Sequence, residues 1–311
     1  MSRAAGPSLN LIEIASLSDP RVAEYRNIKD AELRRRQGLF IVEGRGSLRC
    51  MLEQSLFSPL SLFLNPAAVA AFSEPLAKLR CETPIYVAPR ELMNDIAGFN
   101  VHRGVLAMGR NDAARSVESL LESLRNQEAR GAGAHAASLI VVLENVSNPD
   151  NVGQIFRGCQ AFGVAAVILS PHASDPLYRK AIRTSMGATL RVPFARAKSW
   201  PLDIASALSL AGYTLVGLGP GGIPISPGYE GSEAAVLPTR AALVFGSEGR
   251  GISSELLEHL DLHLRIDMEP GMDSINVAMA SGIALQHFYA ARAAASASGG
   301  NPRADNPGRQ R

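Results

Sequence analysis

The chain has 311 residues, a length that favours two domains. Of these residues 46% are hydrophobic and 19% charged, a composition typical of a globular protein. No apolar run reaches the roughly 18 residues that a membrane-spanning helix needs, and the first residues lack the apolar core of a secretory signal, so we expect a cytoplasmic protein. The net charge of +2 is too small to indicate nucleic-acid binding by itself, and any such role must rest on local charge.

The cysteines and histidines predict neither a disulfide framework nor a metal site. Cys50, Cys81 and Cys159 are odd in number and far apart, and we expect them to be reduced thiols in the core. His259 and His263 stand four residues apart, but ordinary packing explains that spacing without a metal.

A basic segment opens the first half of the chain. Between Arg21 and Arg49, eight basic residues stand against four acidic ones. We expect a helix over residues 20–36 that Gly38 ends, followed by a buried strand over 39–42. An arginine triplet at a helix end suits both the helix dipole and RNA phosphate, and the segment alone leaves both open. The candidates for RNA binding are Arg26, Lys29, Arg34, Arg35, Arg36 and Arg45.

The remaining elements of this half complete a small α/β module. A helix is expected around residues 48–56, with strands around 60–64 and 83–87. Residues 1–18 are expected to be an N-terminal extension, 19–110 the module itself, and the polar, Ala/Gly-rich segment 111–137 a linker. At the other end of the chain, residues 295–311 have the Gly/Pro/Arg-rich composition of a disordered tail.

Residues 138–294 predict a second α/β domain with a parallel sheet. A β-branched run at 139–143, helical periodicity over 152–162 and a strand-like run at 164–169 make one βαβ unit. The further strands are expected at 214–218, 242–245 and 262–266, with a closing helix over 275–294. Ligands of such sheets bind in loops beyond the carboxyl ends of the strands.

Three of these loops carry polar or glycine-rich sequence. In the first, residues 144–151, helix capping explains Asp150 or Asn151 but not Arg157, placed nearly two turns into the following helix. The second, residues 246–251, has three glycines that permit close backbone approach, but no Lys-Ser or Lys-Thr follows as in a Walker loop.

The third loop, residues 268–276, leads into the closing helix. Ser274 would serve as its N-cap, whereas Asn276 gains little in a helix unless its amide has a partner. A fourth pattern, residues 217–222, matches G-x-G-x-x-G after a strand. Pro220, Pro224 and Pro227 prevent the helix that a dinucleotide site requires, so we reject that interpretation.

In this order, the segments NPDNVGQIFRGCQAFG, VFGSEGRGIS and IDMEPGMDSINVAMA resemble the three signature motifs of the SpoU/TrmH-type branch of the SPOUT RNA methyltransferases. The front segments GLFIVEGRGSL and FNVHRGVLA resemble the family's substrate-binding domain, which is similar to the ribosomal L30e fold. The resemblance implies a parallel sheet with a C-terminal trefoil knot, preceded by an L30e-like α/β RNA-binding domain. It also implies S-adenosylmethionine as cofactor, no metal, a homodimer, and methylation of a ribose 2′-hydroxyl.

The resemblance carries the family's functional positions onto this chain. The implied catalytic residues are Arg157, Asn151, Glu248, Asn276 and Ser274, and the implied cofactor-binding residues are Gly246, Gly251, Ile266, Met268 and Ile275. Arg157 resembles the family arginine proposed as a base, but a guanidinium is effectively always protonated, which favours positioning of the phosphate and the 2′-oxygen. Asp267 departs from the family pattern, because proline is usual there, and this puts the rigidity of the loop in doubt.

Three alternatives remain open. Structured RNA recognised by shape favours ribosomal RNA over transfer RNA, by analogy only. A non-catalytic RNA-binding protein with the same fold would have no use for Asn151, Arg157, Glu248 and Asn276 together. A different nucleotide-dependent enzyme would bind nicotinamide or ATP in place of S-adenosylmethionine.

Overall fold

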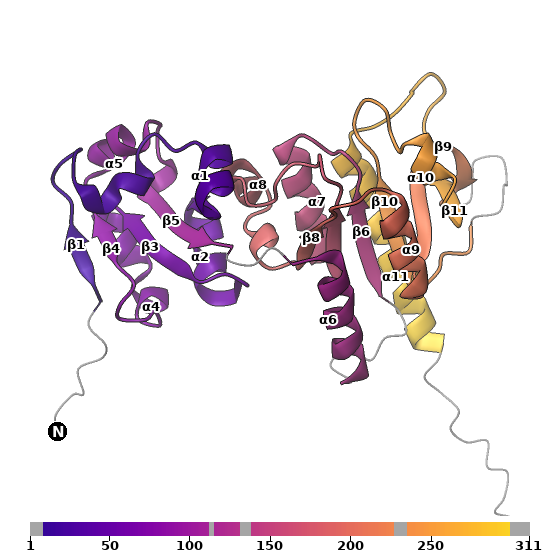
Figure 1. Ribbon diagram of the computed structural model, residues 1–311, viewed down its shortest axis with the longest axis horizontal. Coiled ribbons are helices and arrows are strands. Elements are labelled where there is room, and N and C mark those ends of the chain that lie inside the picture. The colour runs from indigo at the N-terminus through magenta and orange to yellow at the C-terminus, as the bar shows by residue number, and fades with distance from the viewer. Residues whose placement is uncertain (1–8, 112–114, 131–137, 227–234, 299–311) are drawn as a thin grey trace, which may run out of the picture.

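The computed structural model describes residues 9–111, 115–130, 138–226 and 235–298. The described residues form two β-sheets that lie in separate halves of an elongated molecule, each flanked by helices (Figure 1). No helix in these four ranges is long and apolar enough to cross a membrane, and no group of three or more His, Cys, Asp or Glu residues within them could hold a metal ion. Outside the described residues lie segments 112–114 and 131–137 of the expected linker, and the expected tail from residue 299 onward.

The first sheet is mixed. Its five strands run in the order β1 (Leu11–Glu13), β4 (Ile85–Val87), β3 (Pro59–Leu64), β5 (Val105–Arg110) and β2 (Leu39–Glu43). Strands β1, β4 and β3 are parallel, and β5 runs antiparallel to both of its neighbours. The helices of this half are η1 (Pro20–Tyr25), α1 (Asp30–Gln37), α2 (Arg45–Gln54), α3 (Pro66–Ala71), α4 (Ser73–Leu76), α5 (Arg90–Ala97) and η2 (His102–Gly104).

Two expectations for the first half are wrong in part. Residues 11–13 belong to the first sheet as β1, paired with β4, and not to an extension. The single helix expected over 20–36 is instead the 3₁₀ helix η1 followed by α1. The helix breaks because Arg26 is extended and Asn27 has φ +45°, a left-handed conformation that asparagine tolerates. As expected, Gly38 ends α1 in the left-handed conformation.

The second sheet is entirely parallel, which confirms the predicted class. Its order is β11 (Leu262–Arg265), β9 (Thr214–Pro224), β10 (Ala241–Phe245), β6 (Leu139–Leu143), β7 (Ala166–Leu169) and β8 (Phe194–Arg196). The segment 217–222 lies inside β9 and opens no helix, so the dinucleotide interpretation stays rejected.

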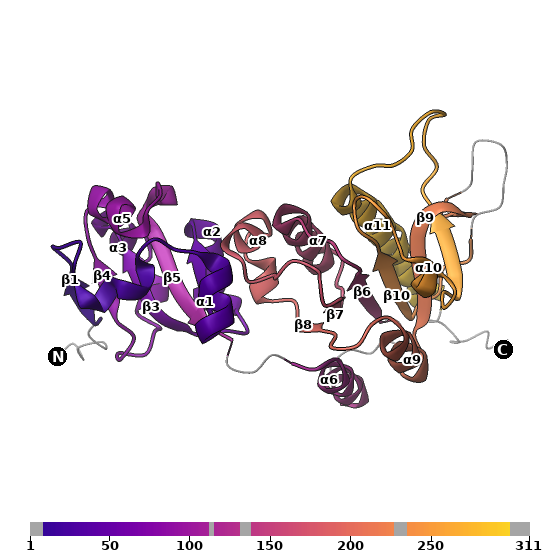
Figure 2. The ribbon, with the colours of Figure 1, turned by 45° about the horizontal axis from the view of Figure 1, so that its top comes forward.

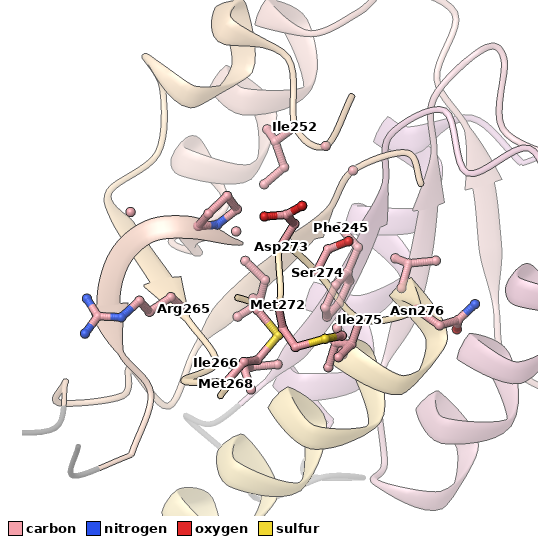
Figure 3. A pocket seen from close by; sticks show the side chains of 18 of the residues that line it. Phe245, Ile252, Arg265, Ile266, Met268, Met272, Asp273, Ser274, Ile275 and Asn276 are labelled. Carbon is pink, nitrogen blue, oxygen red and sulfur yellow. The ribbon is translucent and has the colours of Figure 1, made fainter. Parts of the chain in front are cut away.

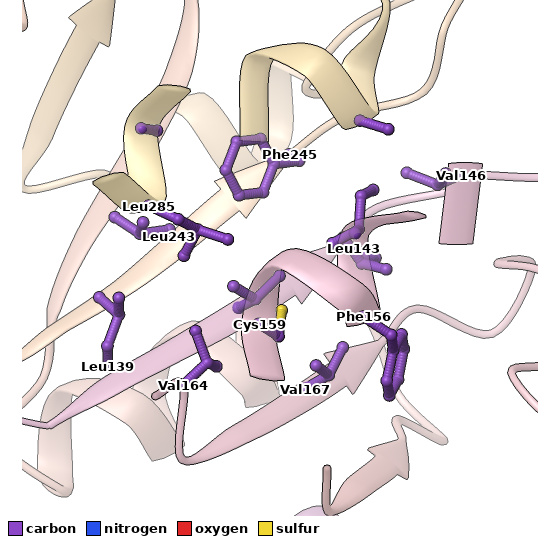
Figure 4. Packing of buried hydrophobic residues seen from close by; sticks show 14 of the residues in the cluster. Leu139, Leu143, Val146, Phe156, Cys159, Val164, Val167, Leu243, Phe245 and Leu285 are labelled. Atoms are coloured by element: carbon purple, nitrogen blue, oxygen red, sulfur yellow. The ribbon is translucent and has the colours of Figure 1, made fainter. Parts of the chain in front are cut away.

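Helices cover both faces of this sheet (Figure 2). On one face, α7 (Pro149–Ala161) and α11 (Val277–Ser298) pack Phe156, Leu285 and other apolar side chains onto the strands (Figure 4). On the other face lie α6 (Val117–Ala129), α9 (Leu202–Leu210) and α10 (Ser254–Leu257). Because α11 continues to Ser298, the tail expected from residue 295 is wrong for residues 295–298.

The expected linker contains α6. Ser116 caps this helix, and the apolar residues Val117, Leu120, Leu121 and Leu124 recur at helical spacing and are buried against the second sheet. The polar average composition of the segment conceals this stripe, which is why a linker is the wrong expectation for residues 117–129.

The two halves share one core where they meet. Helix α8 (Arg179–Thr184) and the 3₁₀ helix η3 (Ala188–Leu190) follow β7, yet Leu177, Ile182 and Leu190 pack with Phe40 and Leu48 of the first half. Cys50 Sγ donates to the carbonyl of Gly187 across the junction. Of the cysteines expected in the core, Cys159 is buried, Cys50 is half-buried and Cys81 is exposed, so the expectation is wrong for Cys81.

Candidate active site

A cavity of about 820 Å³ opens at the carboxyl ends of β9, β10 and β11 (Figure 3). Its walls are segments 218–221, 245–248, 250–252 and 265–277, together with His263 of β11, Ala280 of α11 and Leu257 of α10. All five positions predicted to bind a cofactor line it, as do three of those predicted to be catalytic: Gly246, Gly251, Ile266, Met268, Ile275, Glu248, Ser274 and Asn276.

The glycine-rich loop after β10 is a tight reversal of the backbone. Ser247 and Gly251 exchange two backbone hydrogen bonds, 3.1 and 2.9 Å long, and Gly251 has φ +68°. A Cβ on Gly246 would overlap the backbone of Gly251, whereas a Cβ on Gly249 would meet nothing within 4 Å. Glycine at position 246 is therefore a requirement of the fold of this loop.

Asn151 joins all three loops. Its Nδ2 donates to Oε1 of Glu248 at 2.6 Å, and its Oδ1 accepts from Nδ2 of Asn276 at 3.1 Å. Asn151 is only 4% exposed, so breaking either bond would leave a buried amide without that partner. The spacing of these residues in the chain, 97 and 125 positions, explains why sequence alone does not reveal the contact.

The helix caps differ from those expected. Asn148 caps α7 by accepting from the amide of Asp150, so neither Asp150 nor Asn151 is the cap. At α11, Oδ1 of Asn276 accepts from the amides of Ala278 and Met279, at 2.9 and 3.3 Å, and Asn276 takes the place expected for Ser274. Asn276 therefore fixes the start of α11 and the position of Asn151 with opposite ends of one amide.

Sequence reasoning missed Glu144, which is 2% exposed and directly follows β6. Its carboxylate accepts from Nε1 of Trp200 at 2.8 Å and from both the amide and the hydroxyl of Ser253, at 2.8 and 2.7 Å. Because Ser253 caps α10, Glu144 ties the first loop to the far end of the glycine-rich loop. The signal in the sequence that could have identified Glu144 is a carboxylate directly after a buried strand.

Arg265 was also missed, and it accounts for the unusual Asp267. Its Nε donates to Oδ1 of Asp267 at 2.7 Å, and its Nη1 donates to the carbonyl of Gly222 at 2.6 Å. This ion pair holds the start of the third loop against β9, where the family pattern has a proline. Figure 3 shows Met268 and Met272 of the same loop beside Ile266, on the apolar side of the cavity.

Arg157 does not line the cavity. It is exposed on α7, although Asn151 of the same helix reaches the other two loops. Among the basic residues predicted to bind RNA, Lys29, Arg35 and Arg45 are exposed, and the side chain of Arg36 lies outside the described residues.

Two of those basic residues make contacts within the chain. Nε of Arg34 lies 3.0 Å from Oδ2 of Asp175, and its Nη1 donates to the carbonyl of Gly38. Arg26 donates to the carbonyls of Leu17 and Asp19. Contact of Arg26 and Arg34 with RNA stays a prediction. Both side chains also bind groups of their own chain in the structure.

The parallel sheet and the three-loop cavity at its carboxyl edge define a ligand-binding α/β protein, and comparison with known proteins gives the family. The family model described as the SpoU rRNA methylase family matches residues 138–286. An uncharacterized tRNA/rRNA methyltransferase of Mycobacterium bovis is 34% identical over 281 residues, which covers 89% of this chain and 91% of that protein. The chain belongs to the SpoU methylase family, and this confirms the resemblance of its motifs.

Solved structures agree on the fold. An AdoMet-bound rRNA methyltransferase from Sinorhizobium meliloti superposes with a TM-score of 0.71 at 21% identity, covering 90% of this chain and 97% of that one. A TrmH-family RNA methyltransferase from Porphyromonas gingivalis, described as putative, gives a TM-score of 0.70 at 24% identity, covering 88% and 98%. The likeness therefore extends over both halves of the molecule.

Proposed function

We propose that the protein transfers a methyl group from S-adenosylmethionine to a ribose 2′-hydroxyl of structured RNA, with ribosomal RNA as the favoured substrate. The observation that carries the proposal is the Asn151 amide, which joins Glu248 and Asn276 beside a cavity at the carboxyl edge of the sheet. Membership of the SpoU methylase family supports it. The AdoMet-bound relative from Sinorhizobium meliloti supports the choice of cofactor.

The cavity suits this cofactor. Its volume of about 820 Å³ lies within the usual range for small-molecule sites. Gly246 and Gly251 would let the adenosine approach the backbone closely, while Ile266, Met268 and Ile275 would contact its apolar surfaces. When bound, S-adenosylmethionine supplies an activated methyl group on a sulfonium, and no metal is needed for its transfer.

The chain's own residues would serve mainly to orient the reactants and exclude water. Glu248 and Asn276 fix the loops through Asn151, and Ser274 lies at the cavity wall. Arg157, always protonated as a guanidinium, would hold an RNA phosphate and the 2′-oxygen. The 2′-hydroxyl proton would leave with the help of an RNA phosphate.

A homodimer is part of the proposal. Met279 and Tyr289 of α11 are 60% and 50% exposed, and α11 packs against the Arg157-bearing helix α7. Because Arg157 does not line the cavity of its own chain, we infer that it meets RNA at the contact between two copies.

Three finer features rest on the family resemblance alone. They are a trefoil knot at the C-terminal side of the second sheet, an L30e-like character of the first half with RNA contacts through Lys29, Arg35 and Arg45, and a cytoplasmic location. Exposure of those three side chains is compatible with the RNA contacts.

Transfer RNA is the second candidate substrate, because the relative from Mycobacterium bovis is named a tRNA/rRNA methyltransferase. The test is transfer of labelled methyl from S-adenosylmethionine to total ribosomal RNA and, separately, to total transfer RNA. Nuclease mapping then locates the label. We expect label at one ribose in one pool, lost in Arg157→Ala and retained in Gln154→Ala, a matched change at an exposed position of the same helix.

Failure of transfer to either pool, by a folded protein that binds the cofactor, would contradict both substrates. Absence of cofactor binding as well would favour the non-catalytic RNA-binding protein.

A further inference from the structure

A second cavity, of about 550 Å³, lies at the junction of the two halves. The first half contributes residues around Phe57 and the end of β5, and the second half contributes β8 and Asp175. Among the described residues that line this junction cleft, four are arginines and one is acidic: Arg34, Arg110, Arg115 and Arg196, with Asp175. None of Arg110, Arg115 and Arg196 belongs to the basic segment singled out from the sequence.

Arg196 is built into the cleft. Its Nη1 donates to the carbonyls of Ser170, Pro171 and Ala173, at 2.9, 3.0 and 2.7 Å. Carbonyl oxygens fix the plane of a guanidinium without neutralising its charge. Burial lowers the pKa of Arg196, but an arginine keeps its proton in proteins.

The one carboxylate of the described lining, Asp175, is already engaged within the chain. Oδ2 of Asp175 pairs with Arg34, and its Oδ1 accepts from the amide of Leu177. Arg115 and Arg196 therefore add positive charge that Asp175 does not offset within the described lining, and a concave site focuses this field on an anion.

The cleft also has an apolar side. Leu56 and Leu60 are 49% and 40% exposed there, next to Phe57. Guanidinium groups facing exposed apolar side chains suit a ligand that alternates phosphates with sugars and bases.

The cleft and the proposed active site lie along the same edge of the second sheet. The carbonyls that hold Arg196 follow the carboxyl end of β7, and the active-site cavity opens at the carboxyl ends of β9, β10 and β11. Arg196 ends β8, which lies three to five strands from β10, β9 and β11 in the sheet. With neighbouring strands about 4.8 Å apart, the two sites are about 15 to 25 Å apart across the sheet. One RNA chain lying along this edge would reach both.

We propose that the junction cleft binds the sugar–phosphate backbone of the RNA substrate, through arginines of both halves of the molecule. This inference rests on the proposed function, because it takes RNA to be the substrate. The cleft makes RNA binding depend on the relative placement of the two halves, which the shared core holds.

The test compares RNA binding by Arg115→Glu and by Arg80→Glu. Both residues are exposed, so neither change should disturb the fold, but Arg80 lies outside the cleft. Fluorescence anisotropy would measure the Kd for end-labelled total ribosomal RNA and total transfer RNA over a series of salt concentrations. Thermal unfolding and calorimetric binding of S-adenosylmethionine would be recorded for each variant.

For Arg115→Glu we expect Kd to rise about tenfold, and the slope of log Kd against log salt to fall by about 1, as for the loss of one phosphate contact. Arg80→Glu should stay within about twofold of the unmodified protein, by the same electrostatic argument. Cofactor binding and the unfolding temperature should be unchanged in both.

Asp175→Asn provides an independent readout of opposite sign. An asparagine keeps the acceptor for the amide of Leu177 but removes the only negative charge of the described lining. We expect RNA binding to become tighter, by about two- to fivefold. If Asp175 served only to stabilise the fold, RNA binding would become weaker or stay the same.

Equal effects of Arg115→Glu and Arg80→Glu, or weaker binding by Asp175→Asn, would overturn the inference, even if methyl transfer to RNA is found. Loss of binding in Arg115→Glu without any methyl transfer by the unmodified protein would support the cleft and contradict the proposed function. No RNA binding by the unmodified protein would overturn the inference outright.

Discussion

Nδ2 of Asn151 lies 2.6 Å from Oε1 of Glu248, although 97 positions separate them in the chain. The bond joins the first turn of α7 to the glycine-rich loop after β10, and it is made by a side chain that is almost completely buried. The arrangement of the active-site loops therefore depends on a neutral amide facing a carboxylate.

Asn151→Asp replaces that amide with a second carboxylate. The like charges would repel each other in a partly buried site, and Asn276 would keep its acceptor. We expect loss of cofactor affinity by at least about tenfold and a stability loss of about 1 to 3 kcal/mol. Calorimetric titration and urea unfolding measure these, with Glu255→Gln at an exposed position of α10 as the control. Unchanged cofactor affinity would mean that the Asn151 contact does not shape the cavity.

Gly246→Ala places a methyl group against the backbone of Gly251 and should open the loop. Cofactor binding should fall below detection. The far-ultraviolet circular dichroism should stay that of the folded protein, because strand β10 ends one residue earlier, at Phe245. Gly249→Ala, whose Cβ would meet nothing, should bind normally. Equal binding by the two variants would contradict the need for close backbone approach.

Glu144→Gln removes one of the acceptors of a carboxylate that takes three hydrogen bonds. An amide group would then face a donor, either Trp200 or Ser253, so we expect destabilisation by about 1 to 3 kcal/mol. Ser253→Ala loses the hydroxyl bond to Glu144 and the N-cap of α10 but keeps the backbone bond and places no amide against a donor. We therefore expect a smaller loss, of about 0.5 to 2 kcal/mol. Urea unfolding followed by the fluorescence of Trp200, the one tryptophan of the chain, tests the order of the two effects.

Leu120→Ala tests whether α6 is part of the second domain. Leu120 is fully buried against the sheet, so its truncation should cost about 2 to 5 kcal/mol. Glu122→Ala, an exposed change on the same helix, should cost little. If both variants unfold at the same urea concentration as the unmodified protein, α6 contributes nothing to this core.

The pKa of Asp30 is raised by burial, an effect that the charge of Arg179 only partly opposes. An acid with a raised pKa contributes less stability as the pH rises through its folded-state value. Asp30→Asn keeps an acceptor for the amide of Arg179 and should therefore raise the unfolding temperature at pH 7. The gain should shrink toward zero as the pH falls to the range in which Asp30 is protonated, and a gain independent of pH would contradict this account.

Sequence patterns predicted the centre of the second sheet well, because β6 and β10 are continuous apolar runs buried on both faces. They predicted the cavity-lining loops because those segments carry family motifs. Sequence patterns could not predict contacts between residues far apart in the chain, such as those of Asn151 with Glu248 and of Glu144 with Ser253. Average composition also misled where a narrow apolar stripe decided the structure, as in α6.

The core shared between the halves bears on how the chain is made. Ile182 and Leu190 pack with Phe40 and Leu48, so the first half cannot complete its core until the segment after β7 has left the ribosome. A nascent chain that stops before α8 would expose the apolar surfaces which those residues cover. The order of synthesis thus puts the docking of α8 and η3 among the last steps in the folding of the first half.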